Sequence, residues 1–126
     1  MIKILVVDDE QDVQMLYQQK FRKEVRAGEF EFHFEYSGEA ALEYLRNHGR
    51  DDVVLLLSDI NMPGMSGLDL LKQTKEKFSH LKVIMVTAYN DESNYNTAVA
   101  YGSDDYFTKP VDFASLKSKL LNLSAL

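Results

Sequence analysis

The sequence predicts an α/β fold in which a five-stranded parallel sheet is covered by five helices, distributed over both of its faces. Apolar runs of strand length alternate with amphipathic segments of helix length along the whole chain, a pattern typical of parallel α/β sheets. Three of these runs are almost continuously apolar, as expected for strands buried on both faces. The length of 126 residues indicates a single domain, because domains commonly contain roughly 150 residues.

Five segments are expected to form the strands. The central strands are the apolar runs at residues 2–7, 53–57 and 83–86. Residues 30–36 alternate aromatic with polar side chains, and this period of two predicts a strand at an edge of the sheet, with one wetter face. Residues 106–108 are expected to form a short fifth strand that ends before Lys109 and Pro110, because proline stops ladder pairing and favours an extended residue before it.

Five helices are expected to follow the strands. The first carries an apolar stripe at helical spacing, made by Val13, Leu16, Tyr17, Phe21 and Val25. N-cap residues predict where three others begin. These are Ser37, for a helix closed by Gly49, Ser66, with Asp69 at capping-box spacing, and Asp112, for the last helix.

The segment of residues 91–101 is the weakest of the predicted helices. Its asparagines and Thr97 are mediocre helix formers. Only Tyr95, Ala98 and Val99 make an apolar stripe along it. Directly after this segment, Asp104 and Asp105 are interpreted as turn residues before the fifth strand.

Composition excludes several classes of protein. With 45% hydrophobic and 27% charged residues, the chain is globular and not disordered. The absence of cysteine excludes disulfides, zinc–thiolate sites and cysteine nucleophiles. A net charge of -6 has the wrong sign for direct nucleic-acid binding. No apolar run spans a bilayer and no signal peptide is visible, so we expect no membrane association and a cytoplasmic location.

Chemically active side chains follow four of the five predicted strands. Asp8 and Asp9 come after the first strand, Asp59 ends the third, Thr87 ends the fourth, and Lys109 follows the fifth. Ligands of open parallel sheets bind beyond the carboxyl ends of the strands. Any one of these aspartates alone is more commonly a helix cap or a turn residue. The combination predicts one shared site.

The chemistry of that site follows from its charges. Two unit charges 4 Å apart repel by about 4 kcal/mol at an effective dielectric constant of about 20, so three carboxylates require a cation. Oxygen ligands that leave room for water favour Mg²⁺ over a dedicated calcium cage. Lys109 adds a mobile positive charge and Thr87 a hydroxyl donor, both suited to a phosphoryl group. The set predicts phosphoryl transfer to a carboxylate nucleophile.

Four segments of the chain resemble the receiver domain of two-component response regulators. They are the Asp8-Asp9 pair, the DINMPGMSG run at residues 59–67, the VTA run at residues 86–88 and the GSDDYFTKP run at residues 102–110. The resemblance covers residues 1–126 and implies a single receiver domain. It also implies a doubly wound sheet with strand order 2-1-3-4-5.

The resemblance implies a role for each residue of the site. Asp59 would accept a phosphoryl group from a phosphohistidine on a sensor histidine kinase or a histidine phosphotransfer protein. Asp9, Asp59 and the backbone carbonyl of Asn61 would bind Mg²⁺, and Asp8 would bind it directly or through water. Lys109 would pair with the phosphoryl group, next to a cis peptide bond to the following proline.

The resemblance further implies a switch, with only slow autophosphorylation and autodephosphorylation as enzymatic activity. Thr87 would move toward the phosphoryl oxygen and Tyr106 would turn inward behind it. Asn61 and Tyr89 lie two residues beyond Asp59 and Thr87, where they are expected to flank the path of the hydrolytic water. An amide can orient this water and a tyrosine ring can shield it, so Tyr89 is expected to prolong the phosphorylated state.

Three other functional classes fit the sequence less well than a phosphorylated switch. A haloacid-dehalogenase-type phosphatase needs an Asp-x-Asp motif after its first strand, where this chain has Asp8-Asp9-Glu10. A flavodoxin-like carrier needs a phosphate loop of Ser, Thr and Gly at that place. A pseudo-receiver, which acts as an interaction module without phosphorylation, is disfavoured by the intact acids, Thr87 and Lys109.

The output surface is expected on the face formed by the 91–101 helix, the fifth strand and the last helix. Leu116, Leu120 and Leu123 supply the core stripe of the last helix, so Leu121 and Leu126 fall outside it. Lone exposed leucines are common on protein surfaces. Next to a weak helix and Tyr106, however, this surplus favours a phosphorylation-dependent homodimer, since symmetric dimers are the commonest oligomers.

Overall fold

The structure, a computed structural model, describes residues 2–48, 53, 55–88 and 91–125. The strands are β1 (Ile2–Val7), β2 (Phe30–Glu35), β3 (Leu55–Asp59), β4 (Lys82–Thr87) and β5 (Asp105–Thr108). The helices are α1 (Asp12–Lys20), α2 (Arg22–Arg26), α3 (Gly38–His48), α4 (Gly67–Lys77), α5 (Glu92–Ala100) and α6 (Phe113–Ser124). None of the helices within these ranges is long and apolar enough to cross a membrane.

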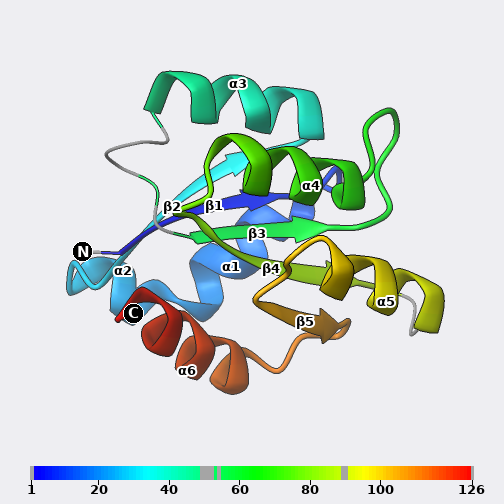
Figure 1. Ribbon diagram of the computed structural model, residues 1–126. Helices are drawn as coiled ribbons and strands as arrows, with labels where there is room; N and C mark the ends of the chain where they lie inside the picture. The colour runs from blue at the N-terminus through cyan, green and yellow to red at the C-terminus, as the bar shows by residue number, and fades with distance from the viewer. Residues whose placement is uncertain (1, 49–52, 54, 89–90, 126) are drawn as a thin grey trace.

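The five strands form one parallel sheet in the order β2-β1-β3-β4-β5 (Figure 1). This confirms the doubly wound architecture. β2, the strand with alternating aromatic residues, lies at one edge and β5 at the other. β1, β3 and β4 lie between them and are almost entirely buried, as their continuous apolar runs predicted. The bounds predicted for β3, residues 53–57, are wrong: the strand runs from Leu55 to Asp59, because its pairing with β4 continues through Ser58 and Asp59.

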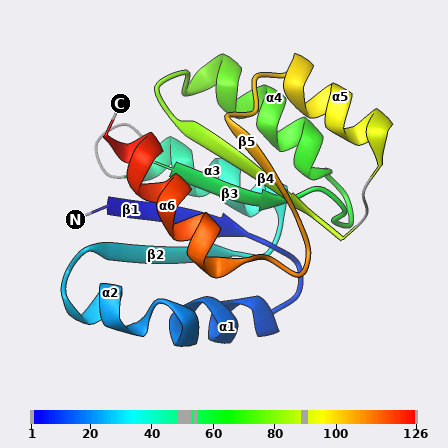
Figure 2. The same cartoon turned by 90° about the horizontal axis from the view of Figure 1, so that it is seen from below.

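Helices cover both faces of the sheet. α3, α4 and α5 pack on one face, and α1 and α6 pack on the other (Figures 1 and 2). Successive strand residues point to opposite faces, so β1 contributes Leu5 and Val7 to the first core and Ile4 and Val6 to the second. The sheet thus separates two cores.

The first predicted helix is divided in two, so the described residues contain six helices instead of five. Phe21 has φ -110° and ψ 24°, which ends α1, and α2 begins at the next residue. Its ring is buried, 5.4 Å from that of Phe32 and 5.7 Å from that of Phe113 between centroids. Beyond this bend Val25 is 43% exposed, and Leu16 is 40% exposed. Both residues therefore lie outside the core that the periodicity predicted for them.

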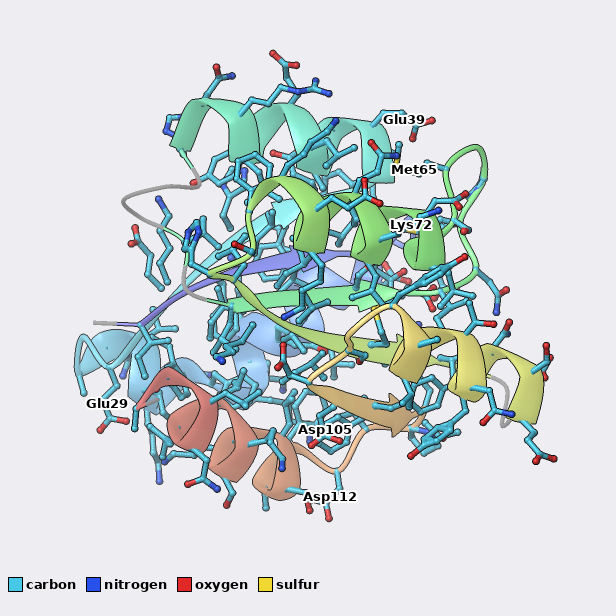
Figure 3. The ribbon with its side chains drawn as sticks, in the orientation of Figure 1. Glu29, Glu39, Met65, Lys72, Asp105 and Asp112 are labelled. Carbon is cyan, nitrogen blue, oxygen red and sulfur yellow. The ribbon has the colours of Figure 1, made fainter. Side chains whose placement is uncertain are left out.

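The predicted N-caps are confirmed. The Ser37 hydroxyl accepts a hydrogen bond from the Ala40 backbone N–H, and that of Ser66 accepts one from Asp69. Asp112 caps α6 in the same manner (Figure 3). Gly49, the predicted end of the Ser37 helix, lies outside the described residues.

The apolar stripe expected on α5 is wrong. Ala98 is buried, but Tyr95 and Val99 are 46% and 55% exposed. The helix begins at the N-cap Asp91, whose carboxylate accepts a hydrogen bond from the Ser93 backbone N–H. α5 therefore buries a single residue of its length and presents apolar side chains outward.

Asp104 is more than a turn residue. Its Oδ2 atom accepts hydrogen bonds from the Val83 backbone N–H and from the Lys75 ammonium, each at 2.8 Å. It thereby links the start of β4, the segment before β5 and α4. The next residue, Asp105, is not a turn residue either: it is the first residue of β5, and its carboxylate pairs with Lys119 of α6 at 3.1 Å (Figure 3).

Gly67 allows α4 to begin directly against the end of β3. Its backbone N–H donates to the Ile60 carbonyl at 2.8 Å. A Cβ atom at this position would lie 1.9 Å from the carbonyl oxygen of Asp59 and 2.7 Å from the Cα atom of Ile60. Only glycine fits without moving the strand end that carries Asp59.

We therefore expect Gly67→Ala to lower the free energy of unfolding by about 2–4 kcal/mol, because the added methyl group displaces backbone. The control is Gly28→Ala, where the Cβ atom meets open space but φ is +75°. Its cost should be about 1–2 kcal/mol, from backbone strain alone. Urea unfolding measures both, and equal losses would contradict the steric explanation.

Candidate functional site

Three carboxylates meet at the carboxyl ends of β1 and β3. One oxygen from each of Asp8, Asp9 and Asp59 lies within 4.8 Å of the others. Asp8 and Asp59 are only 6% and 7% exposed, while Asp9 is exposed. The structure thus brings together the three acids that the sequence predicted to share a site, and it buries two of them.

Backbone groups fix one oxygen of each buried carboxylate. The Oδ1 atom of Asp8 accepts a hydrogen bond from the Glu10 backbone N–H at 3.0 Å. The Oδ1 atom of Asp59 accepts one from the Ile60 backbone N–H at 2.8 Å. Both bonds form where the chain leaves its strand and turns. The other oxygen of each carboxylate, Oδ2, forms an ion pair with Lys109.

Lys109 joins the site from the end of β5. Its ammonium lies 3.0 Å from the Oδ2 atom of Asp8 and 3.7 Å from that of Asp59. Its backbone N–H donates to the Thr87 carbonyl at 2.7 Å, which holds this segment beside β4. The peptide bond to Pro110 is cis, as the resemblance implied.

Burial and neighbouring charges shift the pKa values of Asp59 and Lys109. Burial, and then the charge of Asp8, raise the pKa of Asp59 from 3.8 to about 6, against the lowering effects of Lys109 and of the Ile60 N–H. For Lys109 the largest effect is burial, which lowers its pKa. The hydrogen bond and charge of Asp8 and the charge of Asp59 outweigh it, so the pKa of Lys109 is raised. Within the described residues, the Lys109 ammonium thus pairs with two of the three carboxylates.

Thr87 and Tyr106 lie behind this cluster on neighbouring strands. Thr87 is fully buried at the end of β4. Burial raises the pKa of Tyr106, and the nearby Thr87 hydroxyl lowers it in part. The Tyr106 hydroxyl is buried and makes no well-formed hydrogen bond within the described part of the chain. Its ring packs edge-on against Tyr95 of α5, with centroids 5.2 Å apart.

The loop between β3 and α4 is held by a residue that sequence reasoning missed. The Oε2 atom of Glu39, in the first turn of α3, accepts a hydrogen bond from the Met65 backbone N–H at 3.3 Å (Figure 3). Nothing in the local pattern around Glu39 indicates this contact across 26 residues. Asn61 is exposed in the same loop, and Tyr89 lies outside the described residues, so their predicted effects on the hydrolytic water stay predictions.

The donor set fits magnesium. Three carboxylates converge and two are buried. Among the residues that the structure describes, Lys109 is the one lysine that forms ion pairs with them. A small set of hard oxygen donors is what proteins use to bind Mg²⁺ while leaving positions for water and phosphate. A bound divalent ion would favour the ionised form of Asp59, whose pKa is raised to about 6 by burial and by the charge of Asp8.

Comparison with known families agrees with this geometry. The family model described as response regulator receiver domain matches residues 4–121 of the chain. The chain belongs to this family. Receiver domains are the signalling domains of two-component systems, so the resemblance seen in the sequence is confirmed.

Curated relatives include longer response regulators. The heme response regulator HssR of Staphylococcus epidermidis is 34% identical over 116 residues, which are 92% of this chain and 48% of HssR. RppA of Synechocystis is 31% identical over 119 residues, 94% of this chain and 49% of that protein. The chain thus spans about half the length of these curated relatives.

Solved receiver domains share the fold. One from Clostridium thermocellum has a TM-score of 0.87 and 26% identity, with 99% of this chain and 95% of that chain covered. The response regulator TrrA of Thermotoga maritima, solved in complex with Mg²⁺ and BeF, has a TM-score of 0.80 and 32% identity, with 98% of this chain and 99% of that chain covered.

Neutralising Asp59 should stabilise the receiver domain at neutral pH in the absence of divalent ions. The folded state raises the pKa of Asp59 from 3.8 to about 6. Ionisation of Asp59 therefore lowers the free energy of unfolding fully above about pH 6 and not at all below about pH 4. The rise corresponds to roughly 3 kcal/mol. Asp59→Asn should gain about this amount at pH 7.5, with the gain vanishing as the pH falls toward 4.

Urea unfolding in EDTA across this pH range measures the effect. Asp112→Asn is the control, because hydrogen bonds from Ser115 and Ala114 lower the pKa of Asp112, and its neutralisation should give no gain at neutral pH. A gain for Asp59→Asn that does not depend on pH would contradict the electrostatic explanation.

Proposed function

We propose that this receiver domain accepts a phosphoryl group on Asp59, in a Mg²⁺-dependent transfer from a phosphohistidine, and that the phosphorylated state changes a partner surface. The observation that carries the proposal is the convergence of the buried Asp59 carboxylate, two further carboxylates and the Lys109 ammonium in one site. The complex of TrrA with Mg²⁺ and BeF supports magnesium as the ion of this site.

The transfer is a single displacement at phosphorus. The Oδ2 atom of Asp59 forms the new P–O bond while the P–N bond to the donor imidazole breaks, and the imidazole takes up a proton from water. Asp8, Asp9, Asp59 and the Asn61 backbone carbonyl are the proposed Mg²⁺ ligands. The bound ion supplies positive charge that favours ionised Asp59 and balances the phosphoryl oxygens.

Lys109 and Thr87 bind the phosphoryl group once it is attached to Asp59. The Lys109 ammonium, already 3.7 Å from Asp59, pairs with one phosphoryl oxygen, and the Thr87 hydroxyl donates to another. Tyr106 follows into the space that the hydroxyl leaves, because its own hydroxyl is buried without a well-formed hydrogen bond among the described residues. Autophosphorylation and autodephosphorylation are slow on this proposal, so the domain is a switch and not an enzyme.

The proposed partners follow from the family. Response regulators work with histidine kinases, and a sensor kinase or a histidine phosphotransfer protein is the proposed donor. The acidic net charge of -6 argues against direct nucleic-acid binding by this domain. We place these partners, and the domain, in the cytoplasm.

The acceptor is tested with acetyl phosphate and Mg²⁺. Intact-mass spectrometry should find one added phosphoryl group, labile in base, and the group should be absent from Asp59→Asn and from samples with EDTA. Asp105→Asn, which alters an aspartate paired with Lys119 outside the site, should be phosphorylated like the unchanged protein. Full phosphorylation of Asp59→Asn would place the acceptor elsewhere. No phosphorylation of the unchanged protein would favour a pseudo-receiver.

Two substitutions, at Lys109 and at Thr87, distinguish the conformational switch from the binding of Mg²⁺. Lys109→Ala should bind Mg²⁺ as tightly as the unchanged protein or more tightly, because the lysine competes with the ion for the same negative field. Thr87→Ala should bind Mg²⁺ equally well. Both should lose the NMR shift changes around Tyr106 that acetyl phosphate produces. Retention of those changes in Thr87→Ala would contradict the proposed coupling.

The surface of α5, β5 and α6 is the proposed site of a phosphorylation-dependent homodimer. Leu121 is 41% exposed, as predicted, and α5 adds the exposed Tyr95 and Val99. Leu126 lies outside the described residues. Sedimentation velocity should detect dimers with acetyl phosphate and Mg²⁺, and Leu121→Glu should abolish them without changing phosphorylation. Monomers in both states would leave only a different partner for this surface.

A further inference from the structure

A cavity of about 620 Å³ lies on the sheet face covered by α1 and α6, directly beside the acid cluster. Figure 2 shows the two helices that flank this part of the sheet. Its floor is formed by strand residues and its walls by α1 and by the segment that leads into α6. The main apolar lining residues are Val6, Leu57, Val86, Val13, Tyr17 and Phe113.

The cavity has the size and chemistry of a small-molecule site. Such sites usually measure about 300–1,000 Å³ and combine apolar walls with a few convergent polar groups. Here the rings of Tyr17 and Phe113 lie 5.5 Å apart at 82° and offer aromatic surface. At the rim Leu16 is 40% exposed although it lines the cavity, so the apolar interior continues to the surface.

The polar end of the cavity carries an excess of negative charge. Asp8, Glu10 and Asp59 line it together with Lys20 and Lys109. Lys109 is already paired with two carboxylates, at 3.0 and 3.7 Å. The Lys20 ammonium lies 5.8 Å from the centroid of the Phe113 ring. With three acidic and two basic lining side chains, this end of the cavity favours a cationic group.

A buried hydroxyl also faces this space. Tyr17 is 5% exposed and lines the cavity. Burial and then the negative charges of Asp8 and Asp59 raise the pKa of Tyr17. The described residues offer its hydroxyl no hydrogen-bond acceptor, and a bound molecule can supply one.

We propose that this cavity binds a small molecule with a flat apolar body and one cationic head, of the arylalkylamine class. The body lies against the edge-to-face pair that Tyr17 and Phe113 form in the cavity wall, and the ammonium head pairs with Asp8 and Asp59. Since the head uses carboxylates that the metal also needs, the ligand competes with Mg²⁺. It thereby keeps Asp59 unphosphorylated, a consequence that rests on the proposed function, whereas binding itself does not.

Three indoles with one body and different heads test the charge requirement. They are tryptamine, which is cationic, tryptophol, which is neutral, and indole-3-acetate, which is anionic. Titrations followed by ¹⁵N–¹H NMR at low salt should rank their affinities in that order, with tryptamine binding about tenfold more tightly than tryptophol. Millimolar Mg²⁺ should weaken tryptamine several-fold and leave tryptophol nearly unchanged. Equal affinities, or no binding of tryptamine, overturn the proposal.

Substitutions inside and outside the cavity test where the ligand binds. Val13→Phe fills part of the cavity and should weaken tryptamine at least tenfold, while Mg²⁺ affinity is retained. Val99→Phe is the matched control, because Val99 is 55% exposed on α5, which packs on the opposite face of the sheet, and it should bind like the unchanged protein. Unchanged binding by Val13→Phe overturns the proposal. Asp59→Asn should remove most of the preference of tryptamine over tryptophol, and a retained preference also overturns it.

The regulatory consequence has a separate readout. Tryptamine should slow phosphorylation by acetyl phosphate, and added Mg²⁺ should restore it. If Asp59 accepts no phosphoryl group while the indole series behaves as expected, the proposed function fails and the ligand site stands. If phosphorylation proceeds at the same rate with tryptamine bound, the competition fails and the inhibitory role is overturned.

Discussion

The burial of two neighbouring carboxylates is the constraint on which the rest of the receiver domain depends. Asp8 and Asp59 are almost completely covered, and burial together with the charge of Asp8 raises the pKa of Asp59. One backbone N–H for each and one shared lysine offset part of the cost of this burial. The site retains a net negative charge, which favours the binding of a divalent ion. Any charged group that binds there changes the ionisation of Asp59.

The parallel sheet supplies the positions, and close backbone packing keeps them. Asp59 pairs with Val86 in the ladder, so the residue after Val86 follows at the same edge. Lys109 is held to β4 through the Thr87 carbonyl. At the far end of the loop after Asp59, the Gly67 backbone packs directly against the backbone of Asp59 and Ile60. These contacts leave the carboxylate little freedom, which suits chemistry that relies on positioning more than on reactive side chains.

The two faces of the sheet give the site two different surroundings. On the α3, α4 and α5 face, Tyr106 packs on Tyr95 of a helix that buries a single residue of its length, which suits a surface that changes. On the α1 and α6 face, a cavity reaches the same carboxylates. Under the proposed function, a charge change at Asp59 alters the first face, and the proposed ligand on the other face opposes that change.

The sequence by itself determined the α/β class, the strands, the N-caps and the acidic site, because these depend on the spacing of neighbouring residues and on the rule that ligands bind at the carboxyl ends of parallel strands. Tertiary structure alone decided the bend at Phe21, whose ring packs among aromatic residues from β2 and α6. It also decided the approach of Gly67 to Asp59, the anchoring of Met65 by Glu39 and the cavity beside the acids. Each of these depends on atoms that lie far apart in the chain or on two packed backbones, and local periodicity carries no information about such distances.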